Sequence, residues 1–379
     1  MKTPIPQSLI VVLIVCFWSL QNAHAISPTP DGCNPNFTTA EGCDALNSLT
    51  TGAGNTGLGW RSLFSDTTGS FNTGVGGGTL VLNNTGDENT AVGAAALLLN
   101  TGGSQNTAVG TSALVSNDSG DNNTAVGFQA LLSNTSSNFN TAIGNNALEF
   151  NTTGFENTAL GNSALRSNTT GGQNTAIGEN ALEANTTGGG NVALGFDACS
   201  SVITANDVTC IGAFGADVSN TTWIGNVYGV TTQSGTTAPV VISDGGQLGT
   251  VASSERFKKD ITAMDKASEV ILSFRPVTFH YKTDTKDIPQ FGLIAEEVAK
   301  VNPALVLPDK EGKPYTVRYD AVNAMLLNEF LKEHRTVQNQ QNEIDALKAE
   351  LREQKALIQK VSAQLELSKS APQTVVNNQ

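Results

Sequence analysis

Basic side chains are almost missing from the first two thirds of this 379-residue chain. Residues 26–252 contain two of them, Arg61 and Arg166, against sixteen acidic side chains, which gives this stretch a net charge of −14. Such an acidic surface repels nucleic acid and anionic membranes, so we expect no nucleic acid as a partner. Residues 253–379 hold eighteen side chains of each sign and are neutral. The chain therefore changes character near residue 253.

Long apolar runs are also missing after position 25. Residues 1–25 combine Lys2, an apolar run and the small-residue site Ala23-His24-Ala25, which together predict a cleaved export signal. No later stretch matches a membrane span of about 20 apolar residues, and we expect no transmembrane anchor. With 39% apolar residues and 38 glycines, the chain should fold into two or three domains and be secreted or held at the cell surface.

Cysteine is scarce as well. Four cysteines follow the export signal, spaced as Cys33 with Cys43 and Cys199 with Cys210. An even number in an exported chain predicts two local disulfides in these pairs. The alternative is four buried free thiols, which an oxidising compartment disfavours. Neither pair has the spacing of a metal site, and the sequence indicates no cofactor and no metal.

A 17-residue repeat runs through the acidic region. Each unit reads Asn-Thr-Ala-aliphatic-Gly, then Ala-Leu, then a polar turn. A fixed step without insertions indicates stacked repeats. The leading asparagine returns nine times, at Asn55, Asn72, Asn89, Asn106, Asn123, Asn140, Asn157, Asn174 and Asn191.

Short strands joined by Asn/Gly turns fit this unit better than helices, since a 17-residue unit broken by Gly cannot hold two packed helices. We therefore predict a β-solenoid (β-roll) shaft. Its core should be thin, because each coil offers one aliphatic residue and one leucine, both of which we expect to face inward. The aliphatic column is Val92, Val109, Val126, Ile143, Leu160, Ile177 and Leu194, and the leucine column is Leu97, Leu114, Leu131, Leu148, Leu165 and Leu182.

The repeats resemble the Asn-Thr-Ala-x-Gly units of trimeric bacterial adhesins and of phage fibre shafts. The resemblance covers about residues 52–225 and implies a trimeric rod that binds a surface glycan or a host-surface ligand. One departure is that trimeric autotransporter adhesins end in four membrane strands, whereas this sequence ends in polar residues.

Two features of the repeats admit two interpretations each. Six glycosylation sequons fall at one repeat position, where turn chemistry explains the asparagine better than sugar attachment. A column of strand threonines, Thr73 to Thr175, could form an ice- or glycan-binding face, but a stacked hydrogen-bonding ladder is the simpler explanation. The sequons begin at Asn83, Asn117, Asn134, Asn151, Asn168 and Asn185.

Residues after 252 predict a small α+β domain and a coiled coil. Alternating apolar residues predict strands at 277–281 and 315–319, and residues 293–301 have helical spacing. Apolar residues then recur every seven positions, which favours an oligomeric coiled coil over a helix packed on its own domain. This seam consists of Phe330, Val337, Ile344, Leu351, Ile358 and Leu365, with Leu326, Leu347 and Val361 at interleaved sites.

The segments SSERFKKDI, FRPVTFHYK, FGLIAEEVAKVNPALV and YDAVNAMLLNEFLKE are similar, in order, to the C-terminal intramolecular chaperone of phage endosialidase tailspikes. The resemblance covers residues 253 to about 368. It implies a homotrimeric chaperone that holds three chains together during folding and then cuts itself off between Ala252 and Ser253. By position, Ser253 is the nucleophile and Lys258 its partner; the acidic residue usual after the serine is Ser254 here.

The chemistry of such a pair can be argued from the residues. A serine hydroxyl needs a base to take its proton. A lysine amine can act as that base once burial or nearby cations lower its pKa. Arg256 and Lys259 flank Lys258 and would act in that direction. Spacing alone proves nothing, because a serine before a helix is usually a cap.

The sequence thus predicts an exported trimeric fibre with a removable chaperone, whose only enzymatic activity is one cut in its own chain. A tailspike-like carbohydrate-active enzyme with the same tail is the alternative, and it would need paired carboxylates in a cleft. A relative of myelin regulatory factor, which has a related chaperone domain, would need a DNA-binding domain that the acidic region does not provide. The predicted parts are a signal (1–25), a Cys-containing segment (26–51), repeats (52–225), a linker (226–252), the chaperone domain (253–325), the coiled coil (326–368) and a polar tail (369–379).

Overall fold

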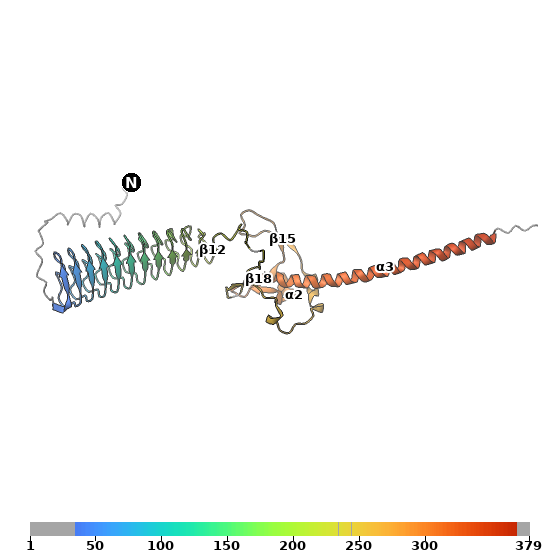
Figure 1. Cartoon of the computed structure of the whole chain (residues 1–379), viewed down its shortest axis with the longest axis horizontal. Helices are drawn as coiled ribbons and strands as arrows, with labels where there is room; N and C mark the ends of the chain where they lie inside the picture. The colour runs from blue at the N-terminus through green and yellow to red at the C-terminus, as the bar shows by residue number, and fades with distance from the viewer. Residues whose placement is uncertain (1–34, 234, 244, 370–379) are drawn as a thin grey trace, which may run out of the picture. The chain divides into compact units, whose positions relative to one another are not determined.

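The computed structural model of the chain describes residues 35–233, 235–243 and 245–369. The predicted export signal, Cys33 and residues 370–379 lie outside these ranges. The chain divides into two compact units, Met1–Gly235 and Thr236–Gln379. The first is a stack of narrow coils, and the second is a small mixed region with one long helix (Figure 1).

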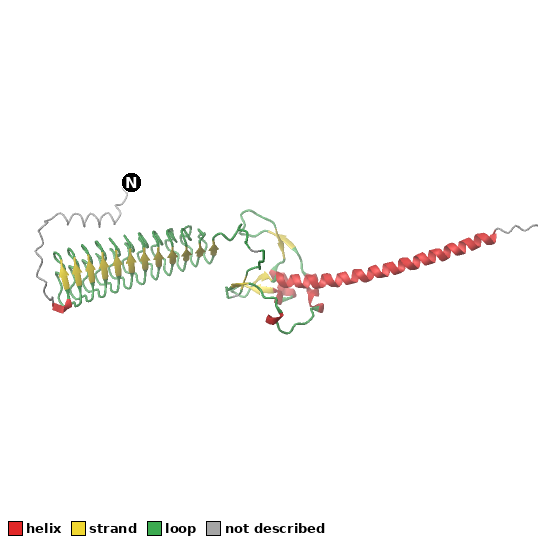
Figure 2. Ribbon diagram, in the orientation of Figure 1, coloured by secondary structure: helices red, strands yellow, loops and turns green. Residues whose placement is uncertain are grey.

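The first unit is a β-solenoid, as predicted. After a 3₁₀ turn, η1 (Pro35–Phe37), twelve strands of three residues form one parallel sheet in chain order (Figure 2). Neighbouring strands of the repeats pair in register one repeat apart, for example Thr107 with Thr124. The strands are β1 Thr39–Glu41, β2 Thr56–Leu58, β3 Thr73–Val75, β4 Thr90–Val92, β5 Thr107–Val109, β6 Thr124–Val126, β7 Thr141–Ile143, β8 Thr158–Leu160, β9 Thr175–Ile177, β10 Val192–Leu194, β11 Thr209–Ile211 and β12 Thr222–Ile224.

The first coil lies ahead of the region where the repeat is legible in the sequence. β1 falls within residues 26–51, and Thr38 stands where later coils have the leading asparagine. Leu46 takes the place of the buried leucine, one repeat before Leu63. The leucine column, unlike the asparagine column, therefore includes this additional N-terminal coil of the solenoid.

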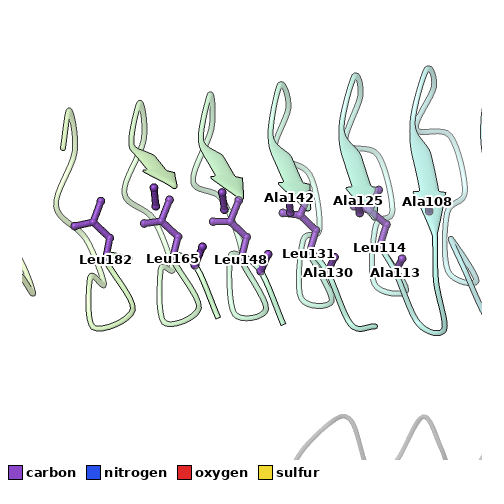
Figure 3. Packing of buried hydrophobic residues seen from close by; sticks show 14 of the residues in the cluster. Ala108, Ala113, Leu114, Ala125, Ala130, Leu131, Ala142, Leu148, Leu165 and Leu182 are labelled. Atoms are coloured by element: carbon purple, nitrogen blue, oxygen red, sulfur yellow. The ribbon is translucent and has the colours of Figure 1, made fainter. Parts of the chain in front are cut away.

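Alanine and leucine form the core of the coils. The central alanine of each Thr-Ala-aliphatic strand is fully buried, as is the leucine of each following turn (Figure 3). Leu114 is typical, with 0% exposure and a left-handed φ of 51°. Burying a leucine is worth about 2 kcal/mol, which offsets the cost of that backbone conformation.

The expectation that the aliphatic column faces inward is wrong. Val109, Ile143 and Leu194 are 36%, 39% and 47% exposed. In a strand, successive side chains point to opposite faces, so the buried alanine forces its two neighbours outward. The strand face of the solenoid is therefore a double row of threonine and aliphatic side chains, and β2 to β12 place no charged residue on it.

Two columns of asparagine run through the interior. Asn106 Nδ2 donates to Asn89 Oδ1 at 3.1 Å and to Gly120 O at 2.7 Å. Asn117 Nδ2 donates to Asn100 Oδ1 at 2.7 Å and to the same Gly120 O at 2.9 Å. All six sequon asparagines belong to the second column and are 0% exposed, so the structure favours turn chemistry for them.

The threonine ladder lies on the turns instead of the strands. Thr152 Oγ1 donates to Thr169 O at 2.9 Å, and Thr169 Oγ1 donates to Thr186 O at 3.0 Å. For the strand column Thr73 to Thr175, no side-chain hydrogen bond occurs within the described residues. The hydrogen-bonding explanation for the strand column is therefore wrong, and these hydroxyl groups are left on the outer face.

Glycine is required after the aliphatic residue in the inner coils. Gly127 has φ 141°, and a Cβ there would lie 2.2 Å from Gly144 O in the next coil. The same close backbone approach recurs at Gly110 and Gly161. The glycine of the repeat thus lets the coils stack at strand spacing.

The second unit contains short paired strands around a small core. Val298, Leu305 and Val317 are the buried apolar residues of this core. The predicted strands appear as β15 and β18 and the predicted helix as α2. The elements are β13 Val241–Ile242, β14 Leu248–Gly249, η2 Glu255–Phe257, η3 Asp265–Ser273, β15 Val277–Phe279, β16 Gln290–Gly292, α2 Ala295–Val301, η4 Pro303–Leu305, β17 Val306–Pro308, β18 Pro314–Val317 and α3 Tyr319–Lys369.

Helix α3 is the predicted long C-terminal helix, and it begins seven residues before residue 326. Its first turns belong to the small core, because Ala321, Val322 and Met325 pack against it. From there on the seam residues are exposed, from 45% at Ile344 to 68% at Ile358. A single chain thus leaves the whole heptad seam uncovered.

Candidate self-cleavage site

Ser253 and Lys258 flank a single 3₁₀ turn, η2, at the start of the charged region. Ala252 and Ser253 lie in an irregular, exposed segment after β14. The N–H of Phe257 donates to Ser254 O at 3.1 Å, and the N–H of Lys258 donates to Glu255 O at 2.9 Å. These two hydrogen bonds close the turn and set the spacing between the serine and the lysine.

The single chain does not join the serine and lysine side chains. Both side chains are exposed, and within the described residues neither makes a hydrogen bond or an ion pair. The Arg256 guanidinium lies 4.6 Å from the Phe257 ring centre. A serine nucleophile needs contact with its base and a site from which water is excluded. The described chain supplies neither at this point.

A polar cluster that the sequence did not reveal fixes η3 to the first turns of α3. The buried Ser268 Oγ donates to Glu329 Oε1, and Asn328 Nδ2 donates to Ser268 Oγ at 2.7 Å. Lys332 Nζ lies 2.7 Å from Glu329 Oε1 and 3.5 Å from Glu269 Oε1. The hydrogen bond from Lys332, with that from Ser268, holds the pKa of the Glu329 carboxyl below its usual value. This cluster positions the helix on the small domain.

An apolar groove of about 670 Å³ lies beside this cluster in the same unit. It is lined by side chains of η3, the β15–β16 hairpin and α3, including Phe274, Val277, Phe291, Val322 and Leu326. Phe291 is 80% exposed, which is unusual for so large an apolar side chain. Leu326 is also an interleaved site of the heptad seam, so the groove is continuous with the seam.

The cysteines were predicted to pair locally. Cys199 and Cys210 form a disulfide, with 2.04 Å between their sulfur atoms. Cys43 is exposed, and Cys33 lies outside the described residues, so the Cys33–Cys43 bond stays a prediction. Among the residues that the structure describes, no three His, Cys, Asp or Glu side chains gather as a metal site would require. No helix in the described part is both long and apolar enough to cross a membrane.

The comparison with protein families decides what the second unit contains. The family described as Chaperone of endosialidase matches residues 253–307. These residues are a chaperone-of-endosialidase domain. The match begins at Ser253, includes η2, η3, β15, β16 and α2, and ends in β17. The domain implies self-cleaving chaperone activity, and chaperones of this family act in trimeric proteins.

The family match covers only part of the second unit. It ends before α3, so the similarity seen in the sequence beyond residue 307 rests on the sequence segments alone. No curated protein and no solved structure matches the chain. The sequence predicted the serine, the lysine and the seam; it missed the groove and the polar cluster, because their residues are scattered between positions 265 and 332 without a motif.

Proposed function

We propose that the chain is an exported subunit of a homotrimeric fibre, assembled by its chaperone domain and then released from that domain by one cut before Ser253. The mature fibre is residues 26–252. Its role is structural and adhesive, with a surface glycan or a host-surface ligand meeting the outside of the rod.

The observation that carries this proposal is the outward aliphatic column. Eleven successive strands, β2 to β12, present threonine (valine in β10) and an aliphatic side chain on a face without charge, although residues 26–252 have a net charge of −14. An uncharged face of this length with a continuous aliphatic column is rare on a monomer and typical of a subunit interface. A second and a third copy of the same chain would cover it along its whole length.

The uncovered parts of the chaperone unit support the same oligomer. The exposed seam of α3 needs other helices, and the groove around Phe291 continues from it. Three chains held at the seam would bring three solenoids to a high local concentration. The core of most coils consists of alanine and one leucine, so a single solenoid gains little from folding alone.

The cut is a chemical step by Ser253 and Lys258 in the assembled trimer. Lys258 Nζ accepts the Ser253 hydroxyl proton, and Oγ attacks the carbonyl carbon of Ala252. The new C–O bond forms as the C–N bond to Ser253 breaks, and the Ser253 nitrogen takes up the proton. Water then hydrolyses the ester, leaving a carboxylate on Ala252 and a free amine on Ser253. Packing between chains supplies the burial that the lysine base requires.

Export is supported by the leader sequence and by the cysteines. A disulfide such as Cys199–Cys210 forms and persists in an oxidising compartment. We therefore place the mature fibre outside the cytosol, secreted or at the cell surface.

A charge on the strand face tests the interface. Ile143→Asp places a carboxylate on that face, and Phe139→Asp places one at a site that is 58% exposed and off the strand. We expect the released rod of the wild type and of Phe139→Asp to have the mass of a trimer by light scattering. Ile143→Asp should be monomeric or unfolded, because an unpaired buried charge costs several kcal/mol. A monomeric wild-type rod, or a trimeric Ile143→Asp rod, would contradict the proposal.

A further inference from the structure

The last coil of the solenoid is built differently from the others. Val192 of β10 pairs with Thr209 of β11, one full repeat further on, but Thr209 pairs with Thr222 of β12, four positions short of a full repeat. The coil from Thr209 to Thr222 is shorter than the others and lacks most of a turn. The coil before it therefore loses the backbone acceptors that every inner coil finds in its successor.

A carboxylate takes the place of those acceptors. In an inner coil, the three N–H groups of residues 152–154 donate to one carbonyl oxygen, that of Thr169, at 3.0, 3.1 and 3.3 Å. In the last full coil the corresponding residues 203–205 donate to Asp217 Oδ1, at 2.9, 2.8 and 2.7 Å. Thr204 Oγ1 adds a hydrogen bond to Asp217 Oδ2 at 3.1 Å. Asp217 thus does for this edge what a capping side chain does for a helix end.

The core of the same coil is closed by a covalent bond. Cys199 stands one repeat after Leu182 in the leucine column, and Cys210 stands one repeat after Ala193 in the alanine column. Both are 0% exposed, and they are bonded to each other. The inward position of β12 holds Trp223, register partner of Cys210, where inner coils have alanine. Where other coils have only a leucine–alanine contact, the last one has a disulfide with an indole at the open end.

We propose that residues 197–225 are a terminal cap that keeps the C-terminal edge of the rod closed after the chaperone unit has left. The idea rests on the proposed release of the tail, since only a released rod depends on its own end. Solenoid ends carry unpaired edge groups and fray or aggregate unless they are capped. Here the disulfide cross-links the core of the last full coil, and Asp217 accepts hydrogen bonds from the N–H groups of residues 203–205.

The test compares rods with and without the tail. Ser253→Ala blocks self-cleavage, and a protease recognition sequence inserted after Ala252 removes the tail on demand. Cap variants are Asp217→Ala, and Cys199→Leu combined with Cys210→Ala, which restores the residues of the inner columns without the bond. Glu179→Ala, at an exposed acid outside both the cap and the measured segment, is the control. Amide hydrogen exchange of residues 199–211 is measured by mass spectrometry.

In the tail-free rod, we expect both cap variants to raise exchange in residues 199–211 by about tenfold or more, and Glu179→Ala to leave it unchanged. With the tail attached the increase should be smaller. Equal exchange in wild type and both cap variants after tail removal would overturn the cap. A monomeric wild-type rod in light scattering would instead contradict the proposed trimer, so the two failures are distinguishable.

Discussion

Asp66 Oδ1 accepts a hydrogen bond from Asn83 Nδ2 at 3.2 Å, at the start of a buried column in which the next seven coils all have asparagine. The N–H of Gly69 also donates to Oδ1, at 3.1 Å. The other oxygen, Oδ2, has no hydrogen-bond partner within the described residues. Burial raises the pKa of Asp66 to about 7, although these two hydrogen bonds act in the opposite direction. A carboxyl group thus occupies a site built for a neutral amide.

Asp66→Asn should stabilise the rod at neutral pH and remove part of its pH dependence. The folded state holds the Asp66 proton up to about pH 7, whereas the unfolded state loses it near 3.8. Stability from this group is therefore full below about pH 4 and is lost as the pH rises to about 7, by an amount on the order of 4 kcal/mol. Denaturant unfolding of wild type and Asp66→Asn from pH 4 to 8 measures it.

The matched control for this variant is Glu179→Gln, at an exposed acid more than six repeats further along the solenoid. This control leaves the Asp66 carboxyl in place, so it should show the same pH dependence of stability as the wild type. If the stability difference between wild type and Asp66→Asn were the same at pH 4 and pH 8, the buried carboxylate would not be the titrating group.

Asn134→Ala should destabilise the rod strongly. Its Nδ2 donates to Asn117 Oδ1 at 2.8 Å, and its Oδ1 accepts from Asn151 Nδ2 at 3.1 Å. The substitution leaves buried groups of two coils unsatisfied, at a cost of about 2–4 kcal/mol per chain. Asn162→Ala, at an exposed asparagine, should change stability by less than about 0.5 kcal/mol.

Buried sequons also predict that no glycan is attached to the folded rod. Incubation of the folded protein with an N-glycosylating enzyme, followed by peptide mapping, should find Asn117, Asn134 and Asn151 unmodified. Denatured chains should be modified at the same sites. Efficient modification of the folded rod would mean that these side chains are on the surface.

The seam of α3 should be required for assembly. Ile344→Asn, Leu351→Asn and Ile358→Asn together remove three apolar layers, so chains should fail to trimerise and the rod should be degraded by protease. The control carries asparagine one residue earlier, at Glu343, Glu350 and Leu357, off the seam. A protease-resistant rod from the seam variant would show that the chaperone unit is not needed.

Disulfide mapping without reduction should find Cys33–Cys43 and Cys199–Cys210. Both pairs close short loops at the two ends of the repeats. Cross-paired peptides, or free thiols at Cys33 and Cys43 in protein purified from an oxidising compartment, would refute the first pair.

The coil length and the leucine column could be predicted from the sequence, because one fixed step and one large apolar residue per unit leave little choice. The orientation of Val109 and its neighbours could not be predicted, because large aliphatic residues are expected inside, whereas here the smaller Ala108 takes the inward position. Strand alternation requires only that Ala108 and Val109 lie on opposite faces, and it does not decide which of them is buried. Because of this error, the sequence did not predict the outward-facing aliphatic column on which the trimer proposal rests.

The candidate site shows a similar limit. Ser253 and Lys258 were found through resemblance to a family, and the structure places them beside one turn without contact. Asp217 and the groove at Phe291 had no signal in the sequence, because one acts through the N–H groups of residues 203–205 and the other through residues far apart in the chain. Contacts between chains are equally invisible in a single sequence.

Mass spectrometry of the purified protein, incubated without added protease, tests the central claim most directly. We expect wild type to give a fibre chain ending at Ala252 and a fragment of residues 253–379. Ser253→Ala and Lys258→Ala should stay full length and still trimerise, because neither residue lies on the seam, while Lys259→Ala should still be cut. An intact wild-type chain after prolonged incubation, or a cut at any bond other than Ala252–Ser253, would contradict the account.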